Sequence, residues 1–309
     1  MLAKLAAWAV VPVLLGLCGC DLEDFGGPRY NQDFHYSYPL KAGGRLSLET
    51  FNGGVELSVW DQDTVDVSGT KYGPSQSAAD ALRIDIVDTP SSVSIRMARP
   101  AEFRGGRGAR FTVKMPRKTV LDQIGTTNGG IQVFGGAGPA RLRTSNGGIR
   151  VEAVDGDIDL RTSNGSIDVT DVAGEVVAHT SNGRVRLENV RGGLQAGTSN
   201  GNITAIVAAN QDVRPIRLDS SNGSIDLTLP ANLTSGVRAS TSNSGITLHM
   251  PGPVNARIVA RTSNASVSSD FEVRMEGELN KNHMEGVMGN GGPLLDLSTS
   301  NGPIRFLRM

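Results

Sequence analysis

The stretch RTSNGGIRVEAVDGDIDLRTSNGSIDV, from Arg143 to Val169, contains the tetrapeptide TSNG twice, 18 residues apart. Asparagines that follow a serine or threonine continue this interval on both sides, and beyond residue 200 the interval lengthens to 21 or 22 residues. Repetition at a fixed period is typical of solenoids, in which each repeat stacks on the next. The asparagines of the series are Asn128, Asn146, Asn164, Asn182, Asn200, Asn222, Asn243 and Asn264, and the last copy of the motif contains Asn301.

A second, shorter period lies inside the first. Glycines recur every nine residues from Gly129 to Gly201 without a gap. Each 18-residue unit is therefore expected to contain two half-units, each made of a turn around a glycine and a short strand. Since glycine, and to a lesser degree asparagine, tolerates positive φ, we expect each Asn-Gly pair to form a sharp corner in that conformation.

Between the corners, apolar and polar residues alternate with the period of two that indicates a strand with one buried face. Ile149 and Val151 illustrate the pattern, and Ile167 and Val169 repeat it 18 residues later. Because the units are in register, equivalent strands should lie side by side as parallel neighbours. The sequence therefore predicts an all-β fold, a parallel two-sheet β-solenoid with 18-residue turns. At the usual strand spacing, roughly nine turns would be about 40 Å long, and right-handed winding is expected of parallel crossovers.

The repeated asparagine is predicted to be mainly structural. In a solenoid the same corner recurs in every turn, so each asparagine amide can donate a hydrogen bond to the carbonyl of the next one. We expect this ladder to be buried, because a buried amide needs such partners. The alternative is that the asparagines bind a ligand directly.

The repeats are expected to extend over most of the chain. Residues 121–309 carry them, and residues 41–120 form an N-terminal β region that is continuous with them, since FNGGVELSVW contains the same corner and alternation. An insertion at about 271–293 precedes the last motif and is expected at one edge of the solenoid, where binding loops often lie. The chain stops after PIRFLRM, and this final strand would leave an apolar edge that only the aromatic N-terminal segment or the 271–293 insertion could cover.

The first residues predict export and a lipid anchor. Residues 1–19 combine a basic start, an apolar run and small residues, as a signal peptide does. The form LCGC at 17–20 resembles the bacterial lipobox, which implies cleavage after Gly19 and lipidation of Cys20. The alternative is an ordinary signal peptide, and the cysteine that remains has no disulfide partner. Residues 20–40 are expected to form a tether that holds the domain off a membrane.

Two columns of outward side chains are predicted from the register. Arg150, Asp168 and Arg186 alternate in sign, which is favourable across neighbouring strands. On the other sheet, three basic side chains would be adjacent, which is mildly unfavourable. This second column is either a solvated face or a weak patch for anionic glycans or lipid headgroups. Its members are Arg143, Arg161 and His179.

Composition and motifs argue against several classes of function. The net charge of −1 gives no field for nucleic acid. No aspartate recurs at a fixed place after the glycines, so a calcium-binding roll is disfavoured. The four histidines are scattered and no catalytic motif is present. Asp155, Asp157 and Asp159 are close in sequence, but such carboxylates are common on solvated faces. We therefore expect no metal, no cofactor and no catalytic residues.

FNGGVELSVWDQDTVDV, TTNGGIQV, the TSNG series and the closing GNGGPLLDLSTSNGPIRF are similar to the bacterial putative-adhesin domain of unknown function, a family built from β-strand repeats. The resemblance covers residues 40–309 and implies the fold, but the family supplies no catalytic residues to transfer. We expect a non-catalytic, lipid-anchored envelope module that binds a glycan, an envelope polymer or a protein. A self-assembling scaffold and a polysaccharide-active β-helix enzyme are the alternatives. The oligomeric state and the choice of inner or outer membrane stay open.

Overall fold

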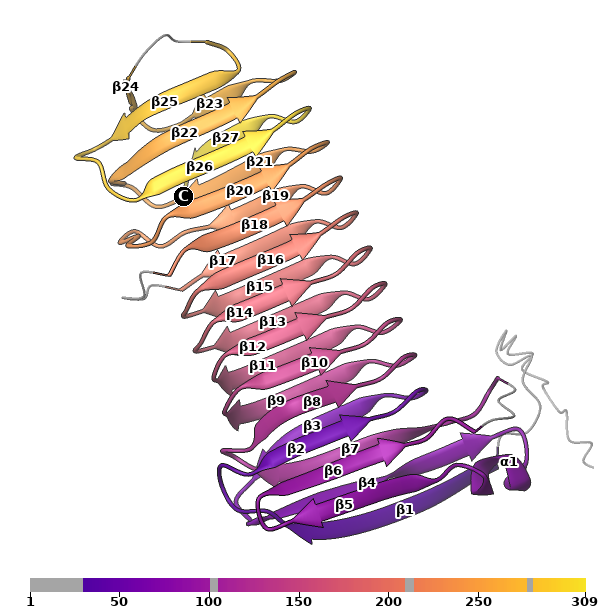
Figure 1. Ribbon diagram of the computed structural model, residues 1–309. Coiled ribbons are helices and arrows are strands. Elements are labelled where there is room, and N and C mark those ends of the chain that lie inside the picture. Colours follow the sequence, from indigo (N-terminus) through magenta and orange to yellow (C-terminus); the bar gives the residue numbers. More distant parts are fainter. Residues whose placement is uncertain (1–29, 101–104, 209–213, 277–279) are drawn as a thin grey trace, which may run out of the picture.

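The computed structural model describes residues 30–100, 105–208, 214–276 and 280–309. In these residues the chain forms two long sheets that face each other along an elongated stack (Figure 1). The only helix in the described ranges is the short α1 (Gln76–Asp80) near the N-terminal end. The predicted all-β fold with two largely parallel sheets is therefore confirmed.

The first sheet, sheet A, has 13 strands. In spatial order they are β1 (Tyr30–Pro39), β4 (Thr64–Gly73), β7 (Gly108–Pro116), β3 (Val55–Trp60), β9 (Ile131–Ala137), β11 (Ile149–Asp155), β13 (Ile167–Val172), β15 (Val185–Val190), β17 (Ile203–Val207), β19 (Ile225–Thr228), β21 (Ile246–Met250), β27 (Ile304–Arg308) and β23 (Val267–Ser269).

The second sheet, sheet B, has 14 strands. In spatial order they are β24 (Arg274–Met275), β25 (His283–Met288), β22 (Ala256–Thr262), β26 (Leu294–Thr299), β20 (Val237–Thr241), β18 (Ile216–Ser220), β16 (Leu194–Thr198), β14 (Val176–His179), β12 (Ile158–Arg161), β10 (Ala140–Arg143), β8 (Val120–Gly125), β2 (Arg45–Glu49), β6 (Ser92–Met97) and β5 (Ile84–Thr89).

One coil of the solenoid consists of a strand of sheet B, a corner and a strand of sheet A. Successive coils are in register through most of the stack, so that Ile149 pairs with Ile167 and Ile167 with Val185, with register shifts between β8 and β10, β15 and β17, and β2 and β8. Ile149, Ile167 and Val185 are at most 1% exposed. Each coil thus buries its aliphatic residues against the opposite sheet and against its neighbours, which no single coil could do alone.

The glycines of the TSNG corners are required because of steric crowding, and not because of the positive φ that was expected. Among the described residues, the glycines with positive φ do not include Gly147, Gly165 or Gly183. Instead, a Cβ atom on Gly165 would lie 1.8 Å from the carbonyl oxygen of Gly147 in the preceding coil. We call the TSNG turn of each coil its ladder corner. The ladder corners therefore need glycine because their backbones stack too closely for any side chain.

The left-handed conformation occurs at a different place in the coil. Ala153, Asp171 and Asn189 have φ values of 56°, 57° and 54°, and Gly135 continues the column with a φ of 78°. Each of these positions lies near the C-terminal end of a strand of sheet A. The Asn189 side-chain amide donates a hydrogen bond to the Asp171 carboxylate in the coil below. Only one member of this column is glycine, so the glycine period did not indicate it.

We expect Ala153→Gly to stabilise the protein by about 0.5–1 kcal/mol, because alanine is strained at positive φ and glycine is not. Urea unfolding of the two proteins measures the difference. Ala178→Gly is the matched control, since Ala178 is fully buried in β14 and the same change there should be destabilising. A loss of stability in the Ala153 variant would contradict the inference that Ala153 is strained at its positive φ.

The asparagine side chains form the predicted ladder. The amide of each one donates to the carboxamide oxygen of the asparagine in the adjacent coil, over nitrogen-to-oxygen distances of 2.6–2.9 Å. The ladder begins at Asn52 and, in spatial order, ends with Asn301 and Asn264. Its asparagines from Asn128 onward are exposed, however, so the expectation of a buried ladder was wrong.

The buried polar column of the ladder corner is threonine. Thr162 is 7% exposed. Its hydroxyl donates to the Gly147 carbonyl at 2.8 Å and accepts from the Gly165 amide at 3.2 Å. Equivalent threonines or Ser220 donate to the neighbouring coil in the same way throughout the stack.

Thr162→Val is expected to cost about 1–3 kcal/mol, since it leaves the buried Gly147 carbonyl and Gly165 amide without a partner. Asn164→Ala removes two ladder bonds at an exposed site, where water replaces them, so we expect a loss of about 1 kcal/mol. Ser163→Ala is the control, because the Ser163 hydroxyl has no hydrogen bond to the described residues. Equal melting temperatures for all three variants would contradict this order.

The spatial order of the coils departs from the sequence order at both ends. The β2/β3 coil lies between the β6/β7 and β8/β9 coils. At the other end, the last coil of the chain, β26/β27, lies between the β20/β21 and β22/β23 coils (Figure 1). The final strand therefore pairs on both sides, and the expectation that it forms an open edge was wrong.

Antiparallel strands cap the stack instead. The aromatic half of the 20–40 segment is β1, which pairs with β4 at the edge of sheet A. Phe34 from β1 packs against Phe111, with ring centroids 5.3 Å apart. At the other end, the 271–293 insertion supplies β24 and β25, which extend sheet B beyond β22.

The predicted signal peptide, residues 1–19, and the predicted lipidation site Cys20 lie outside the described residues. Within the described ranges, no helix has both the length and the apolar character needed to cross a membrane.

Candidate functional site

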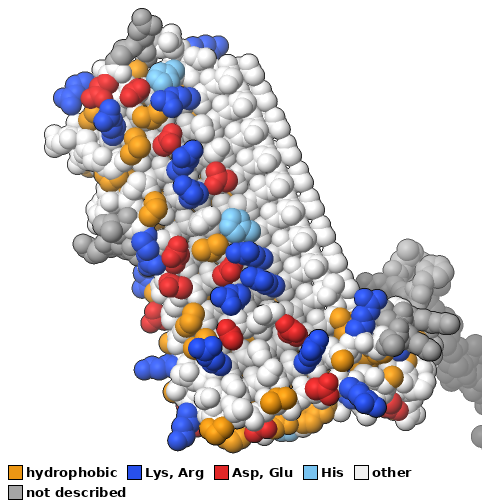
Figure 2. Space-filling model, viewed as in Figure 1, with side chains coloured by type: hydrophobic (Ala, Val, Ile, Leu, Met, Phe, Trp, Pro, Cys, Tyr) orange, Lys and Arg blue, Asp and Glu red, His pale blue; other side chains and the backbone are white. Residues whose placement is uncertain are grey.

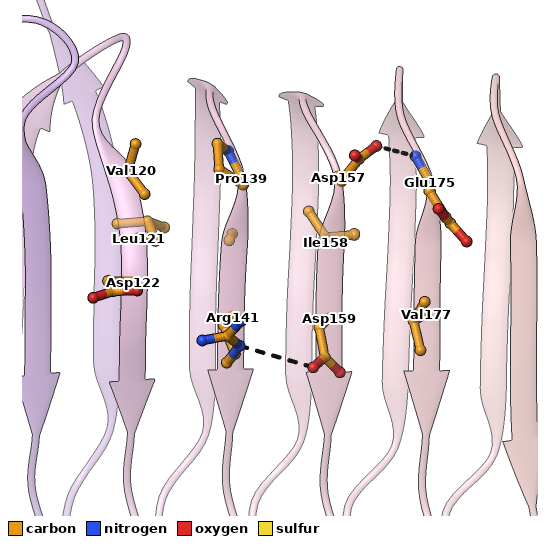
Figure 3. Close-up of a pocket in the computed structure, with 11 residues that line it drawn as sticks. Val120, Leu121, Asp122, Pro139, Arg141, Asp157, Ile158, Asp159, Glu175 and Val177 are labelled. Carbon is orange, nitrogen blue, oxygen red and sulfur yellow. Dashed lines mark hydrogen bonds and ion pairs between the residues drawn. The ribbon is translucent and has the colours of Figure 1, made fainter.

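The outer face of sheet B carries two adjoining grooves over strands β2 to β14. The ladder-side groove lies where these strands enter the ladder corner and has a volume of about 420 Å³. It is lined by Glu49, Thr50, Gly125, Thr126, Thr127, Arg143, Thr144, Ser145, Arg161, Thr162 and Ser163. The proline-side groove lies at the other end of the same strands and has a volume of about 260 Å³ (Figure 3). It is lined by Val120, Leu121, Asp122, Pro139, Ala140, Arg141, Asp157, Ile158, Asp159, Glu175 and Val177.

The proline-side groove contains carboxylates that are paired with cations or backbone amides. Asp159 has ion pairs with Arg161 at 3.0 Å, Arg143 at 3.9 Å and Arg141 at 4.0 Å. Figure 3 shows Arg141 reaching across to Asp159 from the neighbouring strand. Asp159 thus has three arginines within 4.0 Å of its carboxylate.

Asp157 is held in a separate network. It accepts a hydrogen bond from the Glu175 backbone amide at 2.7 Å, and Arg214 lies 3.7 Å away. Arg214 also lies 3.4 Å from the Glu175 carboxylate. Asp155 is exposed at the end of β11 in the other sheet. The three aspartates that are close in sequence therefore have different partners and are not gathered around one site.

The basic column predicted on sheet B exists in register. Arg143 pairs with Arg161, and Arg161 pairs with His179. The imidazole of His179 lies over Gly197, where a Cβ would be only 2.6 Å from its Nδ1 atom. Burial and the positive charge of Arg161 lower the pKa of His179, and Asp159 and Asp219 oppose the shift. The imidazole is neutral at pH 7, so the column carries two positive charges rather than three.

The ladder-side groove is open because Gly125 lacks a side chain. Gly125 lies between Glu49 and Arg143 in the register of sheet B. On the corner side, the hydroxyl groups of Thr127, Ser145 and Ser163 have no hydrogen bond to other described residues. The lining therefore combines the arginines Arg143 and Arg161, both ion-paired with Asp159, with three hydroxyl groups that have no hydrogen bond to the described residues.

Thr50 is the one lining residue whose own polar group is both buried and unpaired. It is 8% exposed, and its Oγ1 atom has no hydrogen-bond partner. The equivalent Thr126 donates to the Gly53 carbonyl at 3.1 Å. Thr50 has no such acceptor because the coil next to it, β6/β7, does not contain a TSNG corner. Sequence reasoning missed Thr50, since its partner depends on the spatial order of the coils.

The second predicted column lies on sheet A. Arg150, Asp168 and Arg186 are in register across β11, β13 and β15. The arginines, however, form ion pairs along their own strands, with Glu152 and Glu188. Asp168 lies 3.7 Å from Arg184. Each charge of the alternating column is thus balanced by an oppositely charged side chain close to it.

The two sides of the solenoid differ in charge. Figure 2 shows basic and acidic side chains interspersed over the strands of sheet B, whereas the flank formed by the ladder corners is free of charge. In the described part of the chain, no group of three or more His, Cys, Asp or Glu side chains could hold a metal ion. The candidate site is therefore a polar binding surface built from arginines and hydroxyl groups.

Comparisons with known proteins give a family and a set of similar solved structures. The model of the Toastrack DUF4097 family matches residues 45–280. No curated protein matches the chain. Three solved structures resemble it at 10–13% identity. They are a "putative cell adhesion protein" from Clostridium sporogenes (10% identity, TM-score 0.23, 90% of this chain and 100% of that chain), a "putative adhesin" from Bacteroides fragilis (13%, 0.33, 89% and 97%) and a "putative lipid binding protein" from Parabacteroides distasonis (13%, 0.49, 89% and 97%).

Proposed function

The chain belongs to the Toastrack DUF4097 family, a domain family without an assigned function, and we propose that it is a non-catalytic module of the bacterial cell envelope. In this proposal a lipid on Cys20 anchors the chain, and the rigid solenoid presents the outer face of sheet B to an envelope polymer or protein. The observation that carries the proposal is the pair of adjoining grooves on that face, one lined by arginines and unpaired hydroxyl groups and the other by carboxylates, Arg141 and apolar side chains.

The pairing of the carboxylates supports binding rather than catalysis. A glycosidase needs two carboxyl groups placed on either side of one bond, one of which is kept protonated by its surroundings. Asp159 lies among three arginines and Asp157 receives a backbone amide. Neither carboxyl group therefore lies in the apolar surroundings that a general acid needs.

The capped ends favour a separate rod over a self-assembling scaffold. End-to-end stacking needs open parallel edges, but β1 and β5 at one end and β25 at the other run antiparallel to their neighbours. The last strands at the other end, β23 and β24, have only three and two residues. Short edge strands of this kind discourage pairing with another molecule.

The binding proposal is tested by screening the purified chain on arrays of glycans and peptidoglycan fragments, with the size of each polymer measured after incubation. We expect a monomer that retains a polymer without shortening it. The double variant Arg143→Gln/Arg161→Gln should weaken this binding, whereas Arg217→Gln/Arg238→Gln, on the same face but in more distant coils, should not. Turnover of any polysaccharide would replace the proposal with the enzyme alternative, and filaments would favour the scaffold.

The lipid anchor is tested by metabolic labelling with an alkyne analogue of palmitate in a bacterial host. The chain should take up label and fractionate with membranes, because two acyl chains or more give stable anchoring. Cys20→Ser should abolish both properties, whereas Cys18→Ser should leave the label in place. Label that persists in the Cys20 variant would contradict the anchor.

A further inference from the structure

We propose that the N-terminal end of the solenoid rests on the surface of a lipid bilayer, so that the rod stands upright on the membrane. The inference rests on the proposed function, because the lipid on Cys20 brings this end to the membrane. The surface that makes the contact, which we call the end face, consists of Tyr30, Phe34, Tyr36 and Tyr38 on β1 and Ile84, Ile86 and Val87 on β5.

The end face is apolar because no further coil covers the core there. β1 and β5 are the outermost strands of the two sheets, so their core-facing side chains have a neighbouring strand on one side only. Phe34, Tyr36, Ile84 and Ile86 pack against the core but are only half-buried. Val87 is 65% exposed, the largest fraction among the large hydrophobic residues of the described chain. Figure 2 shows hydrophobic side chains gathered along this end, and apolar surface of this kind marks a site of interaction.

The tyrosines indicate that the partner of the end face is a membrane interface. The chain has four tyrosines, and all of them lie on β1 and β4, the two outermost strands of sheet A. The hydroxyl groups of Tyr30, Tyr36 and Tyr38 have no hydrogen bond to the described residues. A tyrosine with an apolar ring and a free hydroxyl group suits the boundary between acyl chains and headgroups, where such residues are enriched.

The chain between the anchor and β1 is short enough to keep the end face near the membrane. Ten residues separate Cys20 from Tyr30, and an extended chain of that length spans at most about 35 Å. Sheet A has 13 strands, which at the usual spacing places its far edge roughly 58 Å from β1. The end face is therefore within reach of the bilayer surface, whereas the far end reaches it only if the rod lies flat.

The long sides of the solenoid are less suited to a bilayer than the end face. The outer faces of the sheets carry ion pairs such as Arg150–Glu152 and Arg161–Asp159, and Figure 2 shows charges of both signs over sheet B. Contact with lipid would strip water from these groups, which costs free energy. An upright rod avoids this cost and leaves the grooves of sheet B open to the envelope.

The contact is confined to the headgroup layer. The outer edges of β1 and β5 carry backbone N–H and C=O groups that no strand of the described chain pairs with, and such groups cannot enter the acyl core. Charged residues beside the end face, among them Asp33, Arg83 and Asp85, are exposed and have both signs. We therefore expect the contact to depend little on anionic lipid.

The test places a fluorescent label on the end face of the full chain, purified after acylation of Cys20 and with Cys18→Ser, so that only an introduced thiol is labelled. The chain is reconstituted in phosphatidylcholine vesicles that contain a lipid with a nitroxide on its headgroup. A label on Val87→Cys should be quenched about twofold. The same label on Ile206→Cys or Leu294→Cys should keep its emission, because these residues are also exposed but lie in distant coils. Added phosphatidylglycerol should change none of these values.

A further variant tests whether the apolar surface makes the contact. Tyr30→Asp in the Val87→Cys chain should lower the quenching by about half, because the new charge would have to leave water. The melting temperature should not change, since Tyr30 is 37% exposed. Leu294→Asp in the same chain is the matched control and should leave the quenching intact.

Several results would overturn the inference. Equal quenching of the Val87 and Ile206 labels would show that the rod lies flat. Shielding of the Val87 label from aqueous iodide in the Cys20→Ser chain would show that the protein itself covers the end face, through a second copy if the mass in solution is doubled and through residues 21–29 if it is not.

The palmitate labelling described above separates this inference from the anchor. A chain that takes up palmitate but leaves the Val87 label unquenched would retain the anchor and refute the contact of the end face. Quenching without palmitate would retain the contact and refute the anchor. A chain that takes up no palmitate and does not bind the vesicles would refute both.

Discussion

Gly147→Ala is expected to destabilise the solenoid by about 3 kcal/mol, the upper range for inserting a methyl group into a well-packed site. The new Cβ would lie 1.8 Å from the Gly129 carbonyl oxygen. This oxygen belongs to the backbone of the preceding coil and cannot rotate away. Two coils would have to separate, which would also stretch the threonine and asparagine hydrogen bonds beside the glycine.

The neighbouring glycine provides the control. A Cβ on Gly148 would lie 3.4 Å from the nearest atom, the Ser166 carbonyl oxygen. Gly148→Ala should therefore change the free energy of unfolding by less than about 0.5 kcal/mol, as at most tolerant sites. Chemical denaturation of the two variants distinguishes close stacking from a need for flexibility at the corner. Equal losses of stability in the two variants would contradict the claim that close backbone stacking requires glycine at position 147.

Removal of Leu294–Met309 is expected to have the larger effect. This segment forms the β26/β27 coil, which fills the space between two coils that are consecutive in sequence. Four of its aliphatic or aromatic side chains are fully buried, and at about 1.5–3 kcal/mol each their loss removes on the order of 10 kcal/mol of apolar burial. These side chains are Leu295, Leu297, Ile304 and Phe306.

Amide hydrogen exchange measures the outcome of this deletion. We expect β22 and β23 to lose protection because their parallel neighbours β26 and β27 are gone, and β25 to lose it because it joins the sheet through β22. The coils up to β18/β19 should stay protected. Phe306→Ala in the full chain is the milder companion and should cost about 3–5 kcal/mol. Full protection of β22 in the truncated chain would show that the β22/β23 coil had moved directly onto β20/β21. That result would contradict the claim that the fold needs the β26/β27 coil between them.

The repeating part of the fold was predictable because local sequence and stacking specify the same structure there. Alternation in segments such as 149–151 places side chains on two faces, and the fixed 18-residue interval aligns them with the next coil. The asparagine ladder follows from that register alone. Its exposure did not follow, because both Asn164 and Thr162 belong to the same corner and only the backbone path decides which one turns inward.

The ends and the candidate site depend on long-range order that the repeat does not encode. Nothing in the spacing of Asn264 and Asn301 indicates that Asn301 lies between Asn243 and Asn264 in the ladder. The orphan hydroxyl of Thr50 has the same origin, since it exists because β6/β7 was placed beside β2/β3. Arg143 and Arg161 were found from sequence because they share a column, but Gly125, which opens the groove between Glu49 and Arg143, was not.

The central claim is that the outer face of sheet B binds a polymer without cleaving it. Hydrogen exchange of the chain with and without a saturating glycan oligomer that it retains on the arrays, followed by sizing of the recovered oligomer, tests it most directly. The predicted result is slower exchange at residues 49–51, 125–127, 143–145 and 161–163, with the oligomer returned at its original length. Slower exchange confined to sheet A or to the ends of the solenoid, or a shortened oligomer, would contradict the claim.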